Sequence, residues 1–286
     1  MKPEIKAFFH NSTYTVSYVV SDPASRKAII IDSALDYDNS SGRTATAAAD
    51  EVIDYVKRRD LDVEWILETH VHADHLTAAP YLHEKLGGTV GIGRVVKVVQ
   101  STFNKVFNCE GEVADDGSQF QHLFADGEKI EVGGMTLEVI ATPGHTPACV
   151  TYKIGNAVFV GDTLFMPDFG TARCDFPGGD ARTLYKSIRK ILSYPGETRL
   201  FMCHDYGPNG RDYEWETSVS EQRAKNIHIH DGVSEEEFVK MRSERDATLS
   251  MPALILPSVQ INMRAGHFPK AEANGISYLK VPLNAL

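Results

Sequence analysis

Residues 68–76, Glu-Thr-His-Val-His-Ala-Asp-His-Leu, place four metal-binding side chains within six consecutive positions. These side chains are His70, His72, Asp74 and His75. Imidazole and carboxylate groups are donors that zinc and iron accept readily in proteins. Because the spacing His-x-His-x-Asp-His is specific among metal motifs, the stretch predicts a site for one or two transition-metal ions.

Three further metal-binding residues lie far apart in the chain and each follows an apolar run: His145, Asp162 and His204. His70 also follows such a run, at residues 63–67. Short apolar runs are typical of buried strands. Because α/β sheets present their chemistry where strands end, we expect these four side chains to converge at one edge of a sheet.

Strand and helix patterns alternate along the first part of the chain. Residues 13–32 predict a two-stranded hairpin, and residues 44–59 predict a helix with an apolar face. This order indicates an α/β protein with a mixed sheet and helices outside it. No stretch rich in proline, glycine or serine marks a boundary, so a single domain over residues 1–286 is expected.

The chain after about residue 210 has a different pattern. Residues 218–229 and 234–247 are charged and helical in pattern, and Ser234 with Glu237 predicts a capping box. Residues 254–286 contain three prolines and are expected to be irregular. We therefore expect a C-terminal extension of helical and irregular segments.

Composition and charge exclude several classes of function. The formal net charge is −10, which opposes nucleic acid as a partner because nucleic-acid binders carry basic surfaces. No run reaches the roughly 18 apolar residues of a membrane span, and the opening of the chain lacks the apolar segment of a secretory signal. The four cysteines form no Cys-x-x-Cys motif, so reduced thiols and a cytoplasmic location are expected.

Together, the seven metal-binding residues resemble the pattern of the metallo-β-lactamase superfamily over about residues 10–210. The resemblance implies an αββα sandwich, in which two mixed β-sheets are packed together and flanked by helices. It places the metal at one edge of the two sheets. Within this superfamily, two arrangements of the metal compete.

The first arrangement is a dinuclear zinc site of the glyoxalase II type, which is a thioester hydrolase. By this resemblance all seven residues are ligands: His70, His72 and His145 of one zinc, Asp74, His75 and His204 of the other, and Asp162 of both. A water molecule held between two zinc ions becomes a hydroxide nucleophile near neutral pH.

The second arrangement is a mononuclear iron site that uses only His70, His145 and Asp162. Two histidines and one carboxylate on one face of Fe(2+) leave three positions open for O2 and substrate. The chain resembles bacterial glutathione-dependent persulfide dioxygenases around its motifs, with Thr-Pro-Gly-His-Thr at 142–146 and Gly-Asp-Thr-Leu-Phe at 161–165. This resemblance implies one Fe(2+) ion per chain and favours the iron arrangement.

The persulfide dioxygenase resemblance also implies a reaction, in which glutathione persulfide, O2 and water give sulfite and glutathione. Both reactants would meet in the coordination sphere of one iron ion. The remaining donors, His72, Asp74, His75 and His204, would then bind no second metal. They are expected to form a hydrogen-bonded shell that orients the three ligands.

Four residues are candidates for substrate binding or catalysis, each with a plainer alternative. Arg173 could bind a glutathione carboxylate as a bidentate fork, or it could pair with Asp175. Arg223 and Lys225 lie where glyoxalase II relatives hold glutathione, but they also suit a solvated helix face. Tyr206 could serve catalysis by orienting the iron ligands through its hydroxyl, or it could be a packed aromatic.

A non-enzymatic alternative stays open: the fold could serve as a metal-dependent sensor of O2 or nitric oxide, or as a scaffold. Flavodiiron relatives carry glutamate at the position of His72 and a flavodoxin domain, and neither is present in this sequence. The expected partners are glutathione persulfide and O2, without nucleic acid or membrane. A homodimer is compatible with the sequence.

Overall fold

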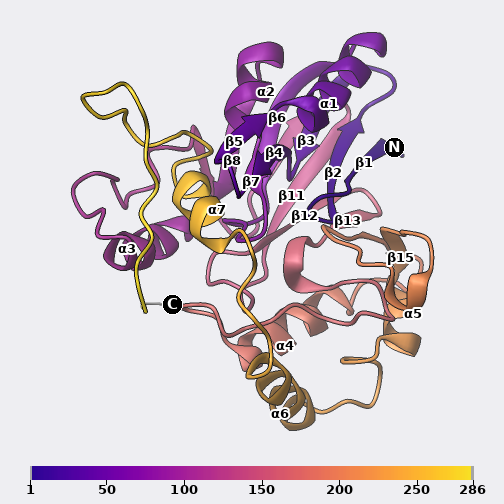
Figure 1. Cartoon of the computed structure of the whole chain (residues 1–286). Helices are drawn as coiled ribbons and strands as arrows, with labels where there is room; N and C mark the ends of the chain where they lie inside the picture. Colours follow the sequence, from indigo (N-terminus) through magenta and orange to yellow (C-terminus); the bar gives the residue numbers. More distant parts are fainter. Residues whose placement is uncertain (1, 285–286) are drawn as a thin grey trace.

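The computed structural model describes residues 2–284 as two packed β-sheets with helices on the outer faces (Figure 1). The first sheet has six strands in the spatial order β1-β2-β3-β6-β8-β9. Their bounds are Glu4–His10 (β1), Thr15–Ser21 (β2), Lys27–Ile31 (β3), Asp62–Glu68 (β6), Thr89–Gly93 (β8) and His122–Phe124 (β9). The strands β3, β6, β8 and β9 run parallel, so their carboxyl ends lie at one edge.

The second sheet has the spatial order β10-β11-β12-β13-β14-β15. Its strands are Lys129–Val132 (β10), Met135–Ala141 (β11), Val150–Ile154 (β12), Ala157–Phe159 (β13), Arg199–Phe201 (β14) and Glu216–Ser218 (β15). The pair β13–β14 is parallel, and the other neighbours are antiparallel. A small third sheet contains β5 (Arg43–Ala45), β4 (Ala34–Asp38) and β7 (Leu76–Thr77). The predicted α/β architecture of two mixed sheets is confirmed.

Strand β2 explains how the two sheets and the helices share a core. Val16, Tyr18 and Val20 pack between the two sheets, whereas Val19 packs toward the helices. This alternation follows from the period of two residues in a strand. Because both faces of the strand are covered, all seven residues of β2 are buried, including the polar Thr15, Ser17 and Ser21.

The helices form one layer on each outer face. The first sheet is covered by α1 (Ala47–Arg58), α2 (Ala79–Leu86), α3 (Val96–Val106) and α7 (Ile255–Asn262). The second sheet is covered by α4 (Ala181–Ile191), α5 (Val219–Lys225) and α6 (Glu235–Asp246). Figure 1 shows α1 and α2 on one side of the sandwich and α4 and α6 on the other.

The structure departs from the predicted elements mainly after residue 210. Strand β15 extends the second sheet, and Ile255–Asn262 form a helix where an irregular tail is predicted. The predicted capping box of Ser234 is confirmed at the start of α6. In the first half, the helix predicted at 44–59 begins only at Ala47, because Arg43–Ala45 pair with β4. No helix within residues 2–284 is long and apolar enough to cross a membrane.

Candidate metal centre

The predicted metal-binding residues meet at one edge of the sandwich. His70, His72, Asp74 and His75 lie in the loop between β6 and β7, immediately after a strand of the first sheet. The other three residues follow strands of the second sheet: His145 after β11, Asp162 after β13 and His204 after β14. The six histidine and aspartate side chains other than Asp74 are at most 7% exposed. The edges of two sheets therefore form one buried, donor-rich site.

His70, His145 and Asp162 form a compact group, and their donor atoms all lie within 4.8 Å of one another. Asp162 Oδ2 is 3.9 Å from His70 Nε2 and 3.7 Å from His145 Nε2. These separations are too long for hydrogen bonds but suit atoms that share one ion. Within residues 2–284, His70 Nε2 and Asp162 Oδ1 are buried without hydrogen-bond partners. Unpaired buried polar atoms are costly, so the residues present fit a bound metal ion.

Hydrogen bonds on the far side of both imidazoles fix the tautomer that a metal requires. His145 Nδ1 donates to the carbonyl of Arg173 at 2.8 Å. The Thr69 hydroxyl donates to Asp32 at 2.9 Å, so it must accept from His70 Nδ1, which lies at 3.0 Å. In both rings the proton is therefore on Nδ1, and the lone pair of Nε2 faces the site. Burial and neighbouring imidazoles also hold the pKa of His70 well below its usual range.

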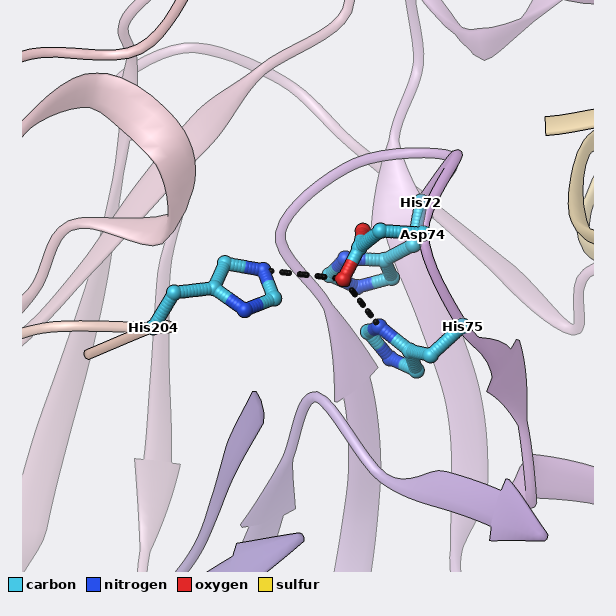
Figure 2. A group of neighbouring side chains, drawn as sticks. All are labelled: His72, Asp74, His75 and His204. Carbon is cyan, nitrogen blue, oxygen red and sulfur yellow. Dashed lines mark hydrogen bonds and ion pairs between the residues drawn. The ribbon is translucent and has the colours of Figure 1, made fainter. Parts of the chain in front are cut away.

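A second group contains His72, Asp74, His75 and His204, shown in Figure 2. Asp74 Oδ2 lies 3.3 Å from His75 Nδ1 and 3.3 Å from His204 Nε2. Although burial opposes its charge, the two imidazoles hold the pKa of Asp74 well below its usual range. The Asp74 carboxylate therefore joins two imidazoles from different sheets. The four donor atoms of this group also lie within 4.8 Å of one another, so they suit either a hydrogen-bonded cluster or a second metal ion.

The inward-facing nitrogen of His204, Nε2, suits a proton or a metal ion but not a free lone pair. Its Nδ1 lies 3.3 Å from the carbonyl of Tyr14, to which it donates. Its Nε2 faces two carboxylate oxygens, of Asp74 at 3.3 Å and of Asp162 at 3.4 Å. A lone pair directed at two carboxylates is unfavourable, so Nε2 either carries a proton or binds a metal ion.

His72 is bound on its outer side by two buried carboxylates that the sequence did not reveal as part of the site. Its Nε2 lies 3.1 Å from Asp32 Oδ1 and 3.2 Å from Glu68 Oε2. Burial opposes the charged form, but these carboxylates raise the pKa of His72 well above its usual value. Asp32 also accepts from the backbone N–H of Thr69 at 2.7 Å. One carboxylate thus holds the start of the loop and one of its histidines.

The C-terminal helix α7 holds the same loop from the other side. The Asn262 side chain donates to the carbonyls of His72 at 2.9 Å and His75 at 2.8 Å. Its oxygen accepts from the N–H of Thr77 at 2.9 Å. Sequence reasoning missed Asn262, because it lies in a segment predicted to be irregular.

A cavity of about 380 Å³ opens onto the metal-binding residues and includes Asp74, His145 and Asp162 in its lining. Aromatic rings form much of its wall, and one of them belongs to Tyr206. The ring of Tyr206 packs on Phe169, with centroids 4.5 Å apart. The side chain of Tyr206 is nevertheless 36% exposed. The structure therefore places Tyr206 at the cavity as a packed aromatic, and its role in orienting the metal ligands stays a prediction.

The predicted substrate-binding residues fall in different places. Arg173 lines the cavity, but its guanidinium is already bound to both oxygens of Asp175, at 2.6 Å each. Arg223 and Lys225 lie on the surface of α5 and pair with other carboxylates, and neither lines the cavity. The structure thus brings Arg173 to the site without a free guanidinium and does not bring Arg223 or Lys225 there. Substrate binding by these three residues stays a prediction.

Comparison with known proteins gives the family. The model of the Metallo-beta-lactamase superfamily matches residues 11–204. The chain is 54% identical to a protein named as a probable metallo-hydrolase from Burkholderia pseudomallei, with 99% of each chain covered. It is 50% identical to glyoxylase B2 of Dictyostelium discoideum, with 100% of this chain and 98% of that protein covered.

More distant relatives carry a different name. The chain is 32% identical to the human mitochondrial persulfide dioxygenase ETHE1, over 92% of this chain and 88% of that protein. The crystal structure of ETHE1 from Myxococcus xanthus superimposes with a TM-score of 0.74 at 30% identity, covering 92% of this chain and 100% of that one. The matched region contains most strands of the two sheets and all seven candidate metal-binding residues, and the chain belongs to the metallo-beta-lactamase superfamily.

Proposed function

We propose that the protein is a persulfide dioxygenase that oxidises glutathione persulfide with O2 to sulfite and glutathione, with one iron ion per chain. The main support is one compact group of donors, although its member Asp162 also lies within 4.8 Å of donor atoms of His204 and Cys203. His70, His145 and Asp162 form the two-histidine, one-carboxylate set that suits non-haem iron, and His72 is grouped with the other donors. The human relative named persulfide dioxygenase matches 92% of the chain in sequence, at 32% identity.

The proposed reaction balances without a further oxidant or reductant. Glutathione persulfide, O2 and water give glutathione, sulfite and two protons; the sulfur–sulfur bond breaks and the terminal sulfur is oxidised. Iron held by His70, His145 and Asp162 would supply the redox chemistry with O2. The chain itself supplies imidazoles fixed in orientation, a carboxylate and a cavity partly lined by aromatic rings.

The deciding experiment joins metal analysis to oxygen uptake. Protein expressed without added metal is analysed for iron and zinc, and oxygen consumption is followed with glutathione persulfide as substrate. The proposal expects about one iron per chain and oxygen consumed with sulfite formed. Iron without turnover would instead favour the sensor or scaffold alternative.

A thioester hydrolase of the glyoxalase II type is the second candidate, because a specific observation favours it. His72, Asp74, His75 and His204 are close enough to bind a second ion, and Asp162 lies between the two groups. The 50% identical relative from Dictyostelium discoideum is named glyoxylase B2. Two tightly bound zinc ions, hydrolysis of S-D-lactoylglutathione and no oxygen uptake would establish this function in place of the dioxygenase.

A further inference from the structure

Three arginines line the cavity, although the whole chain carries a formal net charge of −10. They are Arg173, Arg242 and Arg245. An arginine beside a binding site usually has one of two roles: it holds the protein together through an ion pair, or it binds an anionic group of the ligand. The partners of each guanidinium distinguish these roles.

Two of the arginines are already neutralised by the protein. Arg173 makes a bidentate pair with Asp175, and it also donates to the carbonyl of Ser250 at 2.7 Å. Arg242 is 1% exposed and lies 2.6 Å from Asp246 in the same helix. Its guanidinium also donates to the carbonyl of Thr171 at 3.0 Å. Both guanidinium groups therefore build the cavity wall and have little capacity left for a ligand.

Arg245 differs from both. It lies in the last turn of α6, three residues after Arg242, and its side chain is exposed. Within residues 2–284, no carboxylate lies within ion-pairing distance of its guanidinium, whereas Arg173 and Arg242 each have one. An unpaired guanidinium at a cavity in an acidic protein attracts anions and can bind a carboxylate through two parallel hydrogen bonds.

The cavity therefore has two chemically different parts. Asp74, His145 and Asp162 mark the metal-binding part, and Arg245 supplies an unpaired positive charge to the part formed by α6. Apolar and aromatic residues, among them Phe176, line the rest of the wall. A ligand that fits this arrangement carries a metal-binding sulfur at one end and a carboxylate several bonds away.

We propose that Arg245 is the carboxylate-binding residue of the cavity and selects persulfides of thiols that carry a carboxylate remote from the sulfur. This inference rests on the proposed dioxygenase function and refines its substrate class. It reassigns to Arg245 the role that the sequence suggests for Arg173. The reason is that a substrate carboxylate at Arg173 would have to displace Asp175, whereas Arg245 needs no such exchange.

The test compares Arg245→Gln with wild type on two substrates. Glutathione persulfide carries carboxylates, and cysteamine persulfide carries none. Oxygen uptake gives KM and kcat for each, and iron content is measured in parallel. We expect Arg245→Gln to raise KM for glutathione persulfide about tenfold, as expected for loss of one charge-assisted pair, with full iron content. The rise with cysteamine persulfide should be several times smaller.

The matched control is Lys240→Gln, which removes a positive charge from the same helix. The Lys240 side chain is 76% exposed and does not line the cavity. Lys240→Gln should leave KM for both substrates at the wild-type value. Arg245→Lys keeps the charge but not the fork, so its KM should fall between those of wild type and Arg245→Gln.

A binding measurement separates failure of this inference from failure of the proposed function. S-methylglutathione cannot react as a persulfide, and calorimetry reports its affinity for wild type and for Arg245→Gln. Weaker binding to Arg245→Gln supports the carboxylate site even if no oxygen is consumed. Equal affinity, or an equal rise of KM with both persulfides, overturns the assignment of Arg245 even if the enzyme is a dioxygenase.

Discussion

Asn262 donates its side-chain amide to the carbonyl of His72 at 2.9 Å, although the two residues are 190 positions apart. The same nitrogen reaches the carbonyl of His75, and the side-chain oxygen accepts from the N–H of Thr77. One buried side chain on α7 therefore fixes three backbone groups of the metal-binding loop. Asn262 lies beyond the family match at residues 11–204, so the C-terminal extension completes the site.

Asn262→Ala should destabilise the protein and weaken its hold on metal. The substitution leaves two buried carbonyls and one N–H unpaired, so we expect the free energy of unfolding to fall by about 3 kcal/mol. Urea denaturation measures this loss, and metal content after dialysis against a chelator measures retention.

Ser258→Ala is the matched control for Asn262. Ser258 is buried in the same helix, and its hydroxyl has no hydrogen-bond partner within residues 2–284. Ser258→Ala should change the free energy of unfolding and the retention of metal only slightly. If Asn262→Ala retains metal as well as Ser258→Ala does, the role of Asn262 in holding the loop is refuted.

Asp32→Ala should be strongly destabilising. Asp32 accepts from the backbone and hydroxyl of Thr69 and faces His72 Nε2, and it is 2% exposed. Removing one partner of a buried ion pair typically costs about 3–5 kcal/mol. The hydroxyl of Thr69 would also lose the acceptor that directs it, so His70 would be less well oriented for metal.

Asp62→Ala provides the comparison for Asp32. Asp62 pairs with Lys27, but its side chain is 65% exposed. Exposed ion pairs contribute about 0–1 kcal/mol, so this variant should denature at nearly the wild-type urea concentration. Similar losses in both variants would show that the buried position of Asp32 confers no special stability.

The metal donors could be predicted from the sequence because their signals are local. His70, His145, Asp162 and His204 each follow an apolar run, so their convergence at one sheet edge follows from strand geometry. The other three donors share one short motif with His70. The fold class was predictable because the patterns of its strands and helices are also local in the sequence. Helix α7 was not, since buried residues lie all around it, from Ile255 to Asn262, and leave no polar face to mark a helical period.

The supporting residues could not be predicted, because they are defined by contacts across the fold. Asp32 is 40 positions from His72, and nothing in its own segment indicates an imidazole partner. The sequence also draws attention to Arg173 and gives no reason to consider Arg245. Only the structure shows that Arg173 is bound to Asp175, whereas Arg245 has no carboxylate partner within the described chain.

His228 gives a prediction for the pH dependence of stability. Its Nδ1 accepts from the N–H of Thr171 in the cavity wall, and burial lowers its pKa from 6.5 to about 4. The folded state then binds fewer protons than the unfolded state between these two values. The stabilising contribution is complete above pH 6.5 and is lost as the pH falls toward 4.

His228→Asn retains an acceptor for Thr171 but removes the titration. Urea denaturation at pH 7 and at pH 4.5 should show a smaller loss of stability on acidification for His228→Asn than for wild type. Carboxylates also titrate in this range, but they do so in both proteins. The difference between the two losses of stability therefore reports the contribution of His228. Equal losses would show that His228 remains free to protonate in the folded state.

The last prediction distinguishes one metal ion from two by comparing His145→Ala with His204→Ala. His145 belongs to the group with His70 and Asp162, and its removal should abolish iron binding. His204 Nε2 faces the carboxylates of Asp74 and Asp162 and requires either a proton or a metal ion there. In the mononuclear proposal it carries a proton, so His204→Ala should keep about one iron. Its activity should fall about 10–100-fold, as is typical when an outer partner of metal ligands is lost.

The dinuclear alternative predicts a different metal content for His204→Ala. His204 would then be a ligand, and His204→Ala would lower the count from two ions to one. Metal content is therefore measured in wild type, His145→Ala and His204→Ala prepared side by side. His204 is grouped with Asp74, whereas His145 is grouped with His70 and Asp162. Loss of a single ion in His204→Ala alone would therefore place that ion among His72, Asp74 and His75. That result would refute the iron dioxygenase proposal and leave the hydrolase.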